Sequence, residues 1–151
     1  MADFSLKSPV FEYMGDIPQK YTCQGENISP PLLISNVPEY TKSLILIMED
    51  PDAPGITVTH WVICHLDPST NEISEGGNIK NAIIGKNIMG KNKYMGPCPP
   101  FGKHRYVFKL FALNKKLDLN NKTRKKQLLK ASRDHIIEQT ELIGLYKKIK
   151  T

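Results

Sequence analysis

The chain has 151 residues, of which 40% are hydrophobic and 24% are charged. This balance is typical of one folded domain and excludes a disordered chain, and no apolar run approaches the roughly 18 residues that span a bilayer. The formal charge of +6 comes largely from the segments 115–133 and 146–150. We interpret these segments as solvated lysine-rich surface. No aromatic residue interrupts 115–133, so the pattern disfavours nucleic-acid binding.

Three strands are expected in the first 113 residues, over 43–50 (SLILIMED), 59–66 (THWVICHL) and 105–113 (RYVFKLFAL). These runs are apolar and rich in β-branched or aromatic residues, as buried strands are. Loops that carry proline or glycine separate them, and no helical periodicity intervenes. This spacing predicts two antiparallel sheets packed as a β-sandwich.

The pattern becomes helical after residue 114. Asn120 or Asn121 can cap a helix, because its side-chain oxygen can accept a free N–H of the first turn. Five residues then recur at helical spacing and form one apolar stripe: Leu128, Leu129, Ser132, Ile136 and Ile137. We expect one long helix here and a strand over 140–147 (TELIGLYK). The predicted fold is mainly β with a C-terminal helix, in a single domain over residues 1–151.

The three cysteines are Cys23, Cys64 and Cys98, and their spacing forms no CxxC pair. An odd number at these spacings indicates neither a disulfide framework nor a zinc finger, so we expect reduced thiols. The first residues contain no basic segment followed by an apolar core. We therefore expect no signal peptide, no membrane span and a cytoplasmic location.

Polar side chains at the strand ends form a candidate site. Side chains two residues apart point to the same face of a strand, so His104 and Tyr106 share a face. The same rule places His60 on the face of Val62 and Cys64. Asp50 lies at the carboxyl end of its strand, where it can accept a hydrogen bond from a histidine and fix its tautomer.

If these strand ends converge, one mouth holds Asp50, His60, His104 and Tyr106 behind a rim of Gly96, Cys98, Pro99 and Pro100. Imidazoles and a phenol supply hydrogen-bond donors, and prolines supply rigid apolar walls. Such a site suits a small oxyanion such as a phosphoryl group and suits a bare cation poorly. No metal and no cofactor are expected.

Three motifs occur in a recognisable order: YTCQGENISPPL (21–32), DPDAP (50–54) with HWV (60–62), and GPCPPFGKHRYVFKLFAL (96–113). Together they resemble the phosphatidylethanolamine-binding protein (PEBP) family, in particular its bacterial and archaeal Raf kinase inhibitor-like branch. The resemblance runs from about residue 4 to 148. It implies a β-sandwich of two antiparallel sheets, helices near the C-terminus, and a small preformed pocket for phosphate or phosphorylated head groups.

The resemblance also implies a set of ligand-binding residues. They are Asp50, His60, His104 and Tyr106, with Tyr94, Gly96, Cys98, Pro99 and Pro100 around them and Glu26 and Asn27 nearby. We predict a non-enzymatic protein that binds a small phosphorylated or anionic ligand. We expect it to be a monomer or a homodimer. One version of the hypothesis adds that it regulates a partner protein.

Several alternatives remain at this stage. One is a hydrolase or thiol-dependent enzyme, with Cys98 as nucleophile, His60 or His104 as base and Asp50 orienting the base. A zinc site made of one aspartate and the two histidines is a variant of it. Another is a kinase or protease inhibitor that acts by protein–protein contact. Nucleic-acid binding through the basic surface ranks last.

Overall fold

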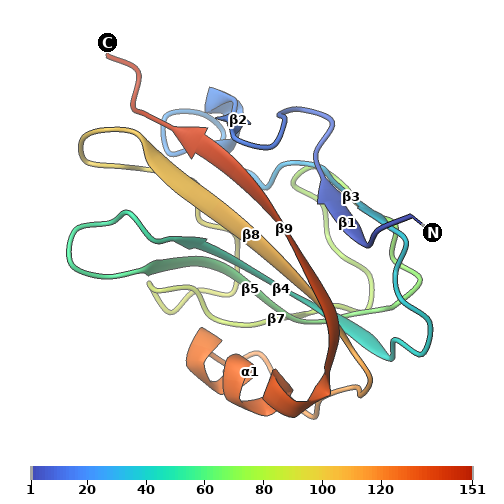
Figure 1. The fold of residues 1–151 in the computed structure, drawn as a ribbon. Coiled ribbons are helices and arrows are strands. Elements are labelled where there is room, and N and C mark those ends of the chain that lie inside the picture. The colour runs from blue at the N-terminus through green and yellow to red at the C-terminus, as the bar shows by residue number, and fades with distance from the viewer. Residues whose placement is uncertain (1, 151) are drawn as a thin grey trace.

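Two sheets form the framework of the molecule in the computed structural model, which describes residues 2–150 (Figure 1). The strands in that range are β1 (Ser5–Lys7), β2 (Gly15–Asp16), β3 (Leu32–Ser35), β4 (Ser43–Asp50), β5 (Val58–Leu66), β6 (Glu72–Ile73), β7 (Ile83–Ile84), β8 (His104–Leu113) and β9 (Ile136–Tyr146). The helical elements are η1 (Gln19–Tyr21), α1 (Lys125–Ser132) and η2 (Arg133–His135).

The larger sheet has six strands in the order β2-β9-β8-β4-β5-β7, and the smaller has three in the order β1-β3-β6. Strands β4, β5 and β8 are the three that the sequence predicts. The predicted β-sandwich is confirmed, and so is the antiparallel pairing, with one departure: the short strand β2 pairs in parallel with β9.

Strand β4 is buried on both of its faces. Leu44, Leu46 and Met48 point into the core between the two sheets. Ile45 and Ile47 point the other way, into a second apolar cluster that α1 closes (Figure 1). This double burial explains why SLILIMED is a continuous apolar run rather than an alternating one.

The helix is shorter than the sequence pattern predicts. It covers the eight residues Lys125–Ser132, and after η2 the chain enters β9 at Ile136. Ile136 and Ile137 are therefore strand residues, exposed on the sheet surface, and the helical stripe that included them is wrong. Strand pairing with β8 outweighs the helical spacing here, and β-branched isoleucine favours the extended chain.

The predicted strand over 140–147 is confirmed and begins four residues earlier. The helix N-cap is Arg124, whose backbone N–H donates to Gln127 Oε1 (2.9 Å), rather than either asparagine. Within the described range, no helix has the length and apolar character needed to cross a membrane.

Candidate functional site

The DPDAP and HRY motifs hold each other through two adjacent side-chain pairs. His104 Nδ1 donates to Asp50 Oδ2 (2.7 Å), and Arg105 donates to Asp52 through Nε (2.9 Å) and Nη2 (2.8 Å). The partners are 54 and 53 residues apart in sequence, but β4 and β8 are neighbours in the sheet. The arginine bonds, with some opposition from burial, lower the pKa of Asp52 to about 2. Asp52 and Arg105 thus form an ion pair that aligns the first pair.

Asp50 is fixed on both of its carboxylate oxygens. Oδ1 accepts from the backbone N–H of Asp52 (2.8 Å), and Oδ2 accepts from His104. A carboxylate only accepts, so Nδ1 of His104 carries the proton in this hydrogen bond.

A β-bulge brings His60 to the same site. The register of β5 against β4 shifts between Met48, which faces Trp61, and Glu49, which faces Thr59, so His60 is the extra residue. Its ring consequently lies 5.3 Å from the ring of Tyr106, on the core side of the sheet, instead of on the face of Val62 and Cys64. The prediction that placed His60 with Val62 and Cys64 is wrong for this reason.

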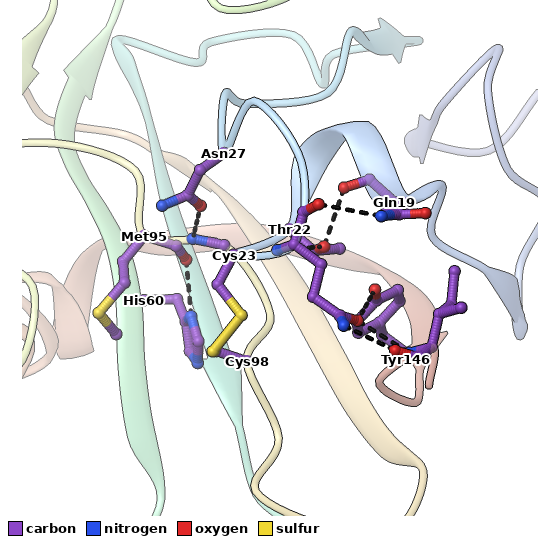
Figure 2. The surroundings of a disulfide bond; sticks show 11 residues. Gln19, Thr22, Cys23, Asn27, His60, Met95, Cys98 and Tyr146 are labelled. Carbon is purple, nitrogen blue, oxygen red and sulfur yellow. Dashed lines mark hydrogen bonds between the residues drawn. A yellow bond between two sulfur atoms is a disulfide. The ribbon is translucent and has the colours of Figure 1, made fainter. Parts of the chain in front are cut away.

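The rim segment before β8 is bonded to His60 twice. The Met95 backbone N–H donates to the His60 carbonyl (3.0 Å), and His60 Nδ1 donates to the Met95 carbonyl (2.6 Å), as Figure 2 shows for the second bond. A carbonyl only accepts, so Nδ1 carries the proton in this bond, and Nε2 is the acceptor nitrogen of the neutral ring.

A second loop, residues 21–27, supports this rim from outside. Tyr94 Oη donates to the Tyr21 carbonyl (2.7 Å), and the Gly96 N–H donates to Asn27 Oδ1 (2.8 Å; Figure 2). The approach is so close that a β-carbon on Gly96 would lie 2.3 Å from that asparagine oxygen. Only glycine fits at this position.

A disulfide joins Cys23 of this loop to Cys98 of the rim (Figure 2). The expectation of reduced thiols is therefore wrong for these two cysteines, and only the buried Cys64 is free among the described residues. The two positions are 75 residues apart, and nothing in their spacing reveals that their loops meet. Cys98 presents no thiolate in this state, so the nucleophile that the enzymatic alternative requires is missing.

Four side chains from three strands meet at this end of the sheet: Asp50, His60, His104 and Tyr106. The ring of His104 stacks 6.4 Å from that of Tyr106. Each residue is at most 6% exposed, so only a small group can touch them from outside.

The electrostatic state of the cluster follows from its burial. Desolvation lowers the pKa of His60 despite its bond to Met95 and the nearby Asp50 carboxylate, so His60 is neutral at pH 7. Desolvation also raises the pKa of Tyr106 far above its usual value, and Asp50 adds to this effect. The phenol therefore stays protonated. The Asp50 carboxylate and the Cys98 backbone lie near its buried hydroxyl, but no group within residues 2–150 meets it with hydrogen-bond geometry.

The other predicted site residues lie around this cluster. Tyr94, Gly96 and Asn27 hold the rim, with the Tyr94 ring packed edge-on against Trp61 (5.4 Å). Pro99 is buried and Pro100 exposed, while Glu26 points to solvent with Lys20 at 3.8 Å.

Sequence reasoning missed Met95, Cys23 and the part played by Asp52. For Asp52, the sequence contained one signal: an acidic residue in DPDAP and a basic residue, Arg105, in HRY, which can pair. No group of three or more His, Cys, Asp or Glu side chains within the described range is arranged to hold a metal ion, so the zinc alternative finds no ligand set.

Fold and cluster together define a β-sandwich with a polar site at one end of its larger sheet. A family model described as phosphatidylethanolamine-binding protein matches residues 7–147. The chain belongs to the phosphatidylethanolamine-binding protein family.

Several relatives match over nearly their whole length. A UPF0098 protein from Methanothermobacter thermautotrophicus is 44% identical over 149 residues, covering 95% of this chain and 99% of that protein. One from Chlamydia pneumoniae is 46% identical over 149 residues, with 95% and 98% covered. These names state no enzymatic activity.

Two crystal structures have the same fold. A putative PEBP homolog from Chlamydia trachomatis superposes with a TM-score of 0.93 at 43% identity, over 97% of this chain and 98% of that one. E. coli YbcL, described as a new member of the mammalian PEBP family, gives 0.89 at 26% identity, over 98% and 100%.

Proposed function

We propose that this protein is a non-enzymatic binding protein that takes a small anionic group, such as phosphate or the phosphate of a head group, at the cluster of Asp50, His60, His104 and Tyr106. The observation that carries the proposal is the buried Tyr106 hydroxyl without a partner. Leaving such a group unsatisfied costs about 1–3 kcal/mol, so a ligand oxygen that accepts from it is strongly favoured.

The two histidines supply the rest of the recognition. Each has its Nδ1 proton committed, His60 to a carbonyl and His104 to a carboxylate, which leaves both Nε2 atoms for the ligand. A protonated Nε2 donates to an anion, and a neutral Nε2 accepts from a protonated phosphate oxygen. Because little of each side chain is exposed, the proposal favours a terminal phosphoryl group that enters end-on.

The proposal is tested by NMR titration with inorganic phosphate and with phosphoethanolamine. We expect resonances of His60, His104 and Tyr106 to shift with saturation. Tyr106→Phe should weaken binding about tenfold, since it removes one hydrogen bond to a charged group. The matched control is Tyr40→Phe, which removes the same hydroxyl from an exposed tyrosine just before β4, at the end opposite to Asp50, and its affinity should stay within about twofold of wild type.

Resonances that stay fixed up to millimolar ligand, or an equal loss in both tyrosine variants, would refute the proposal. Phosphoethanolamine binding without phosphate binding would assign the site to an organic head group rather than to the anion.

Anion binding should also depend on pH in a defined direction. The pKa of free His60 is lowered by burial, and a bound anion raises it, so binding takes up a proton. Affinity for phosphate is then expected to increase as pH falls from 8 through the pKa of the complex, until the free histidine also becomes charged. Calorimetry in two buffers of different ionisation enthalpy measures this uptake, and a flat affinity profile from pH 5.5 to 8 would contradict it.

Regulation of a kinase, protease or other protein partner through the pocket mouth is the second version of this proposal, and the exposed Phe101 beside the rim favours it. Pull-down with wild type and His104→Ala separates partners that need the pocket from those that adhere elsewhere. The cytoplasmic location stays a prediction, and the disulfide weighs against a reducing compartment. Monomer or homodimer likewise stays a prediction.

A further inference from the structure

A cavity of about 400 Å³ lies on the other face of the larger sheet, away from the candidate anion site. Three separate segments form it: the start of β5, the loop before residue 90, and the first turn of α1. Its polar lining includes Thr57, Thr59, Lys86, Arg124, Lys125 and Lys126. We call it the cationic cavity.

Consecutive residues of β4 separate the two sites. Asp50 points to the candidate anion site, whereas Glu49 points to the helix side, where it pairs with Lys125. Side chains on opposite faces of one strand cannot touch one ligand, so the cationic cavity is a distinct place on the molecule.

The walls of the cavity are fixed by backbone bonds. The Lys86 N–H donates to the Thr123 carbonyl (2.8 Å), and the Ile88 N–H donates to the Thr59 carbonyl (2.9 Å). Between them, the buried Asn87 side chain accepts from the Met89 N–H (2.9 Å) and donates to the Lys93 carbonyl (3.0 Å). The loop that carries Lys86 is thereby held against β5 and the segment before α1, so the backbone positions of Lys86 and Arg124 are fixed next to each other.

The charge of the cavity is only partly balanced. Its lining contains four cations and no carboxylate. Glu49 binds Lys125, but it also binds Lys109 (2.6 Å). Among residues 2–150, Lys86 and Arg124 donate to backbone carbonyls, at 3.2 and 3.5 Å, and form no ion pair, which leaves their charge in place. Lys126 forms no ion pair with any described residue. Three like charges around one hollow repel each other, and an anion relieves that repulsion.

We propose that the cationic cavity is a second binding site, for the diphosphate or triphosphate group of a small molecule. Three unbalanced cations match a multiply charged phosphate chain, and the threonine hydroxyls at its edge are additional donors. The volume fits a ligand of that size. No aromatic side chain lines the cavity, so it offers no platform for stacked bases and favours a phosphate chain over a nucleic-acid strand.

The test is calorimetry with inorganic tripolyphosphate at about 0.15 M salt, where diffuse surface attraction is largely screened. We expect one site per chain at the cationic cavity, separate from any binding of a terminal phosphoryl group at the candidate anion site. Lys86→Ala and Lys126→Ala should each weaken binding at least about tenfold, as loss of a charge-assisted contact does. The matched control is Lys148→Ala, an exposed lysine outside the cavity with the same charge change, which should stay within about twofold of wild type.

Two results would overturn the proposal. Equal losses in all three lysine variants would mean attraction by net charge alone, and affinity for single-stranded oligonucleotides that rises with length would mean a nucleic-acid surface. Tyr106→Phe must bind tripolyphosphate at the cavity as wild type does, so failure of the first site leaves this test intact.

Discussion

Gly96 has almost no space around its α-carbon. A β-carbon there would lie 2.3 Å from Asn27 Oδ1 and 2.4 Å from the Tyr21 carbonyl oxygen, and both atoms belong to the loop that braces the rim. The carbonyl is part of the backbone and cannot rotate away. The glycine therefore sets how closely the two loops approach.

Gly96→Ala should lower the free energy of unfolding by about 1–3 kcal/mol, since a methyl group forces the two loops apart. Phosphate affinity should fall with it, because Met95, the residue before Gly96, positions His60. Urea denaturation and phosphate titration measure the two effects. Gly55→Asn is the control: Gly55 has positive φ, which asparagine tolerates, and nothing lies near it. A wild-type stability for Gly96→Ala would show that the rim is loose.

The sequence predicted which residues come together in the candidate site better than it predicted their geometry. Asp50, His104 and Tyr106 could be predicted together because strand alternation and the ends of apolar runs are local patterns. His60 could not be placed correctly, because a bulge depends on the partner strand and leaves no mark in the sequence of β5.

Two loops joined by one disulfide form the rim of the candidate site. Residues 21–27 and the segment 94–98 connect through three hydrogen bonds and the disulfide between Cys23 and Cys98. A cross-link between positions this far apart restricts the unfolded chain strongly and stabilises the folded one. The disulfide therefore contributes to stability as well as to the shape of the rim.

Reduction should consequently destabilise the protein. Wild type treated with dithiothreitol, and the double variant Cys23→Ser with Cys98→Ser, should both lose about 2–4 kcal/mol of unfolding free energy. Thiol titration of the denatured protein should give one free thiol before reduction and three after it. The double variant is also the control, because its stability must not respond to dithiothreitol. Three free thiols in untreated protein would contradict the bond.

Strands and helices could be predicted where the local sequence pattern agrees with the way the segment pairs in the folded protein. SLILIMED, at 43–50, is both a continuous apolar run and a strand with two buried faces. Ile136 and Ile137 fit a helical stripe equally well, and only their pairing with β8 decides that they are extended. The disulfide depends on which loops meet in space, which is a property of the fold and not of cysteine spacing.

Charges on the helix side join the larger sheet to α1. Glu49, on the central strand β4, binds Lys109 on β8 and Lys125 on α1. Burial acts to raise the pKa of Glu49, but the lysine bonds outweigh it and the pKa is lowered. A carboxylate with a lowered folded pKa contributes stability above its unfolded pKa and loses it as pH falls through the folded value. The contribution of Asp52 to stability is lost in the same way as pH falls toward its folded pKa of about 2.

We therefore expect the protein to lose stability steadily below about pH 4, where unfolded carboxylates begin to take up protons. Glu49→Gln should cost about 1–3 kcal/mol at pH 7, because the amide cannot replace the charge. It should cost less at pH 3, where the wild-type carboxylate is closer to protonation. Urea denaturation at both pH values measures this. An equal cost at pH 7 and pH 3 would show that the ion pairs contribute nothing.

The whole fold was predictable from sequence to the level of two packed sheets, because the order of strands and loops limits the arrangements that bury them. The proximity of Lys86 to the start of α1 could not be predicted from the sequence. Lysine runs in sequence read as solvated surface, and the cavity exists only because the loop before residue 90 folds back toward Arg124.

The bond between Cys23 and Cys98 closes a covalent ring that contains β3 to β7, while β8, α1 and β9 lie outside it on a C-terminal tail. A peptide bond cut anywhere inside the ring, such as at the exposed glycines Gly76 and Gly77, leaves one connected molecule. A cut in the tail leaves two polypeptides with no covalent link between them. After a single cut within residues 23–98, the protein therefore remains one covalent molecule until the disulfide is reduced. After a single cut in the C-terminal tail, it does not.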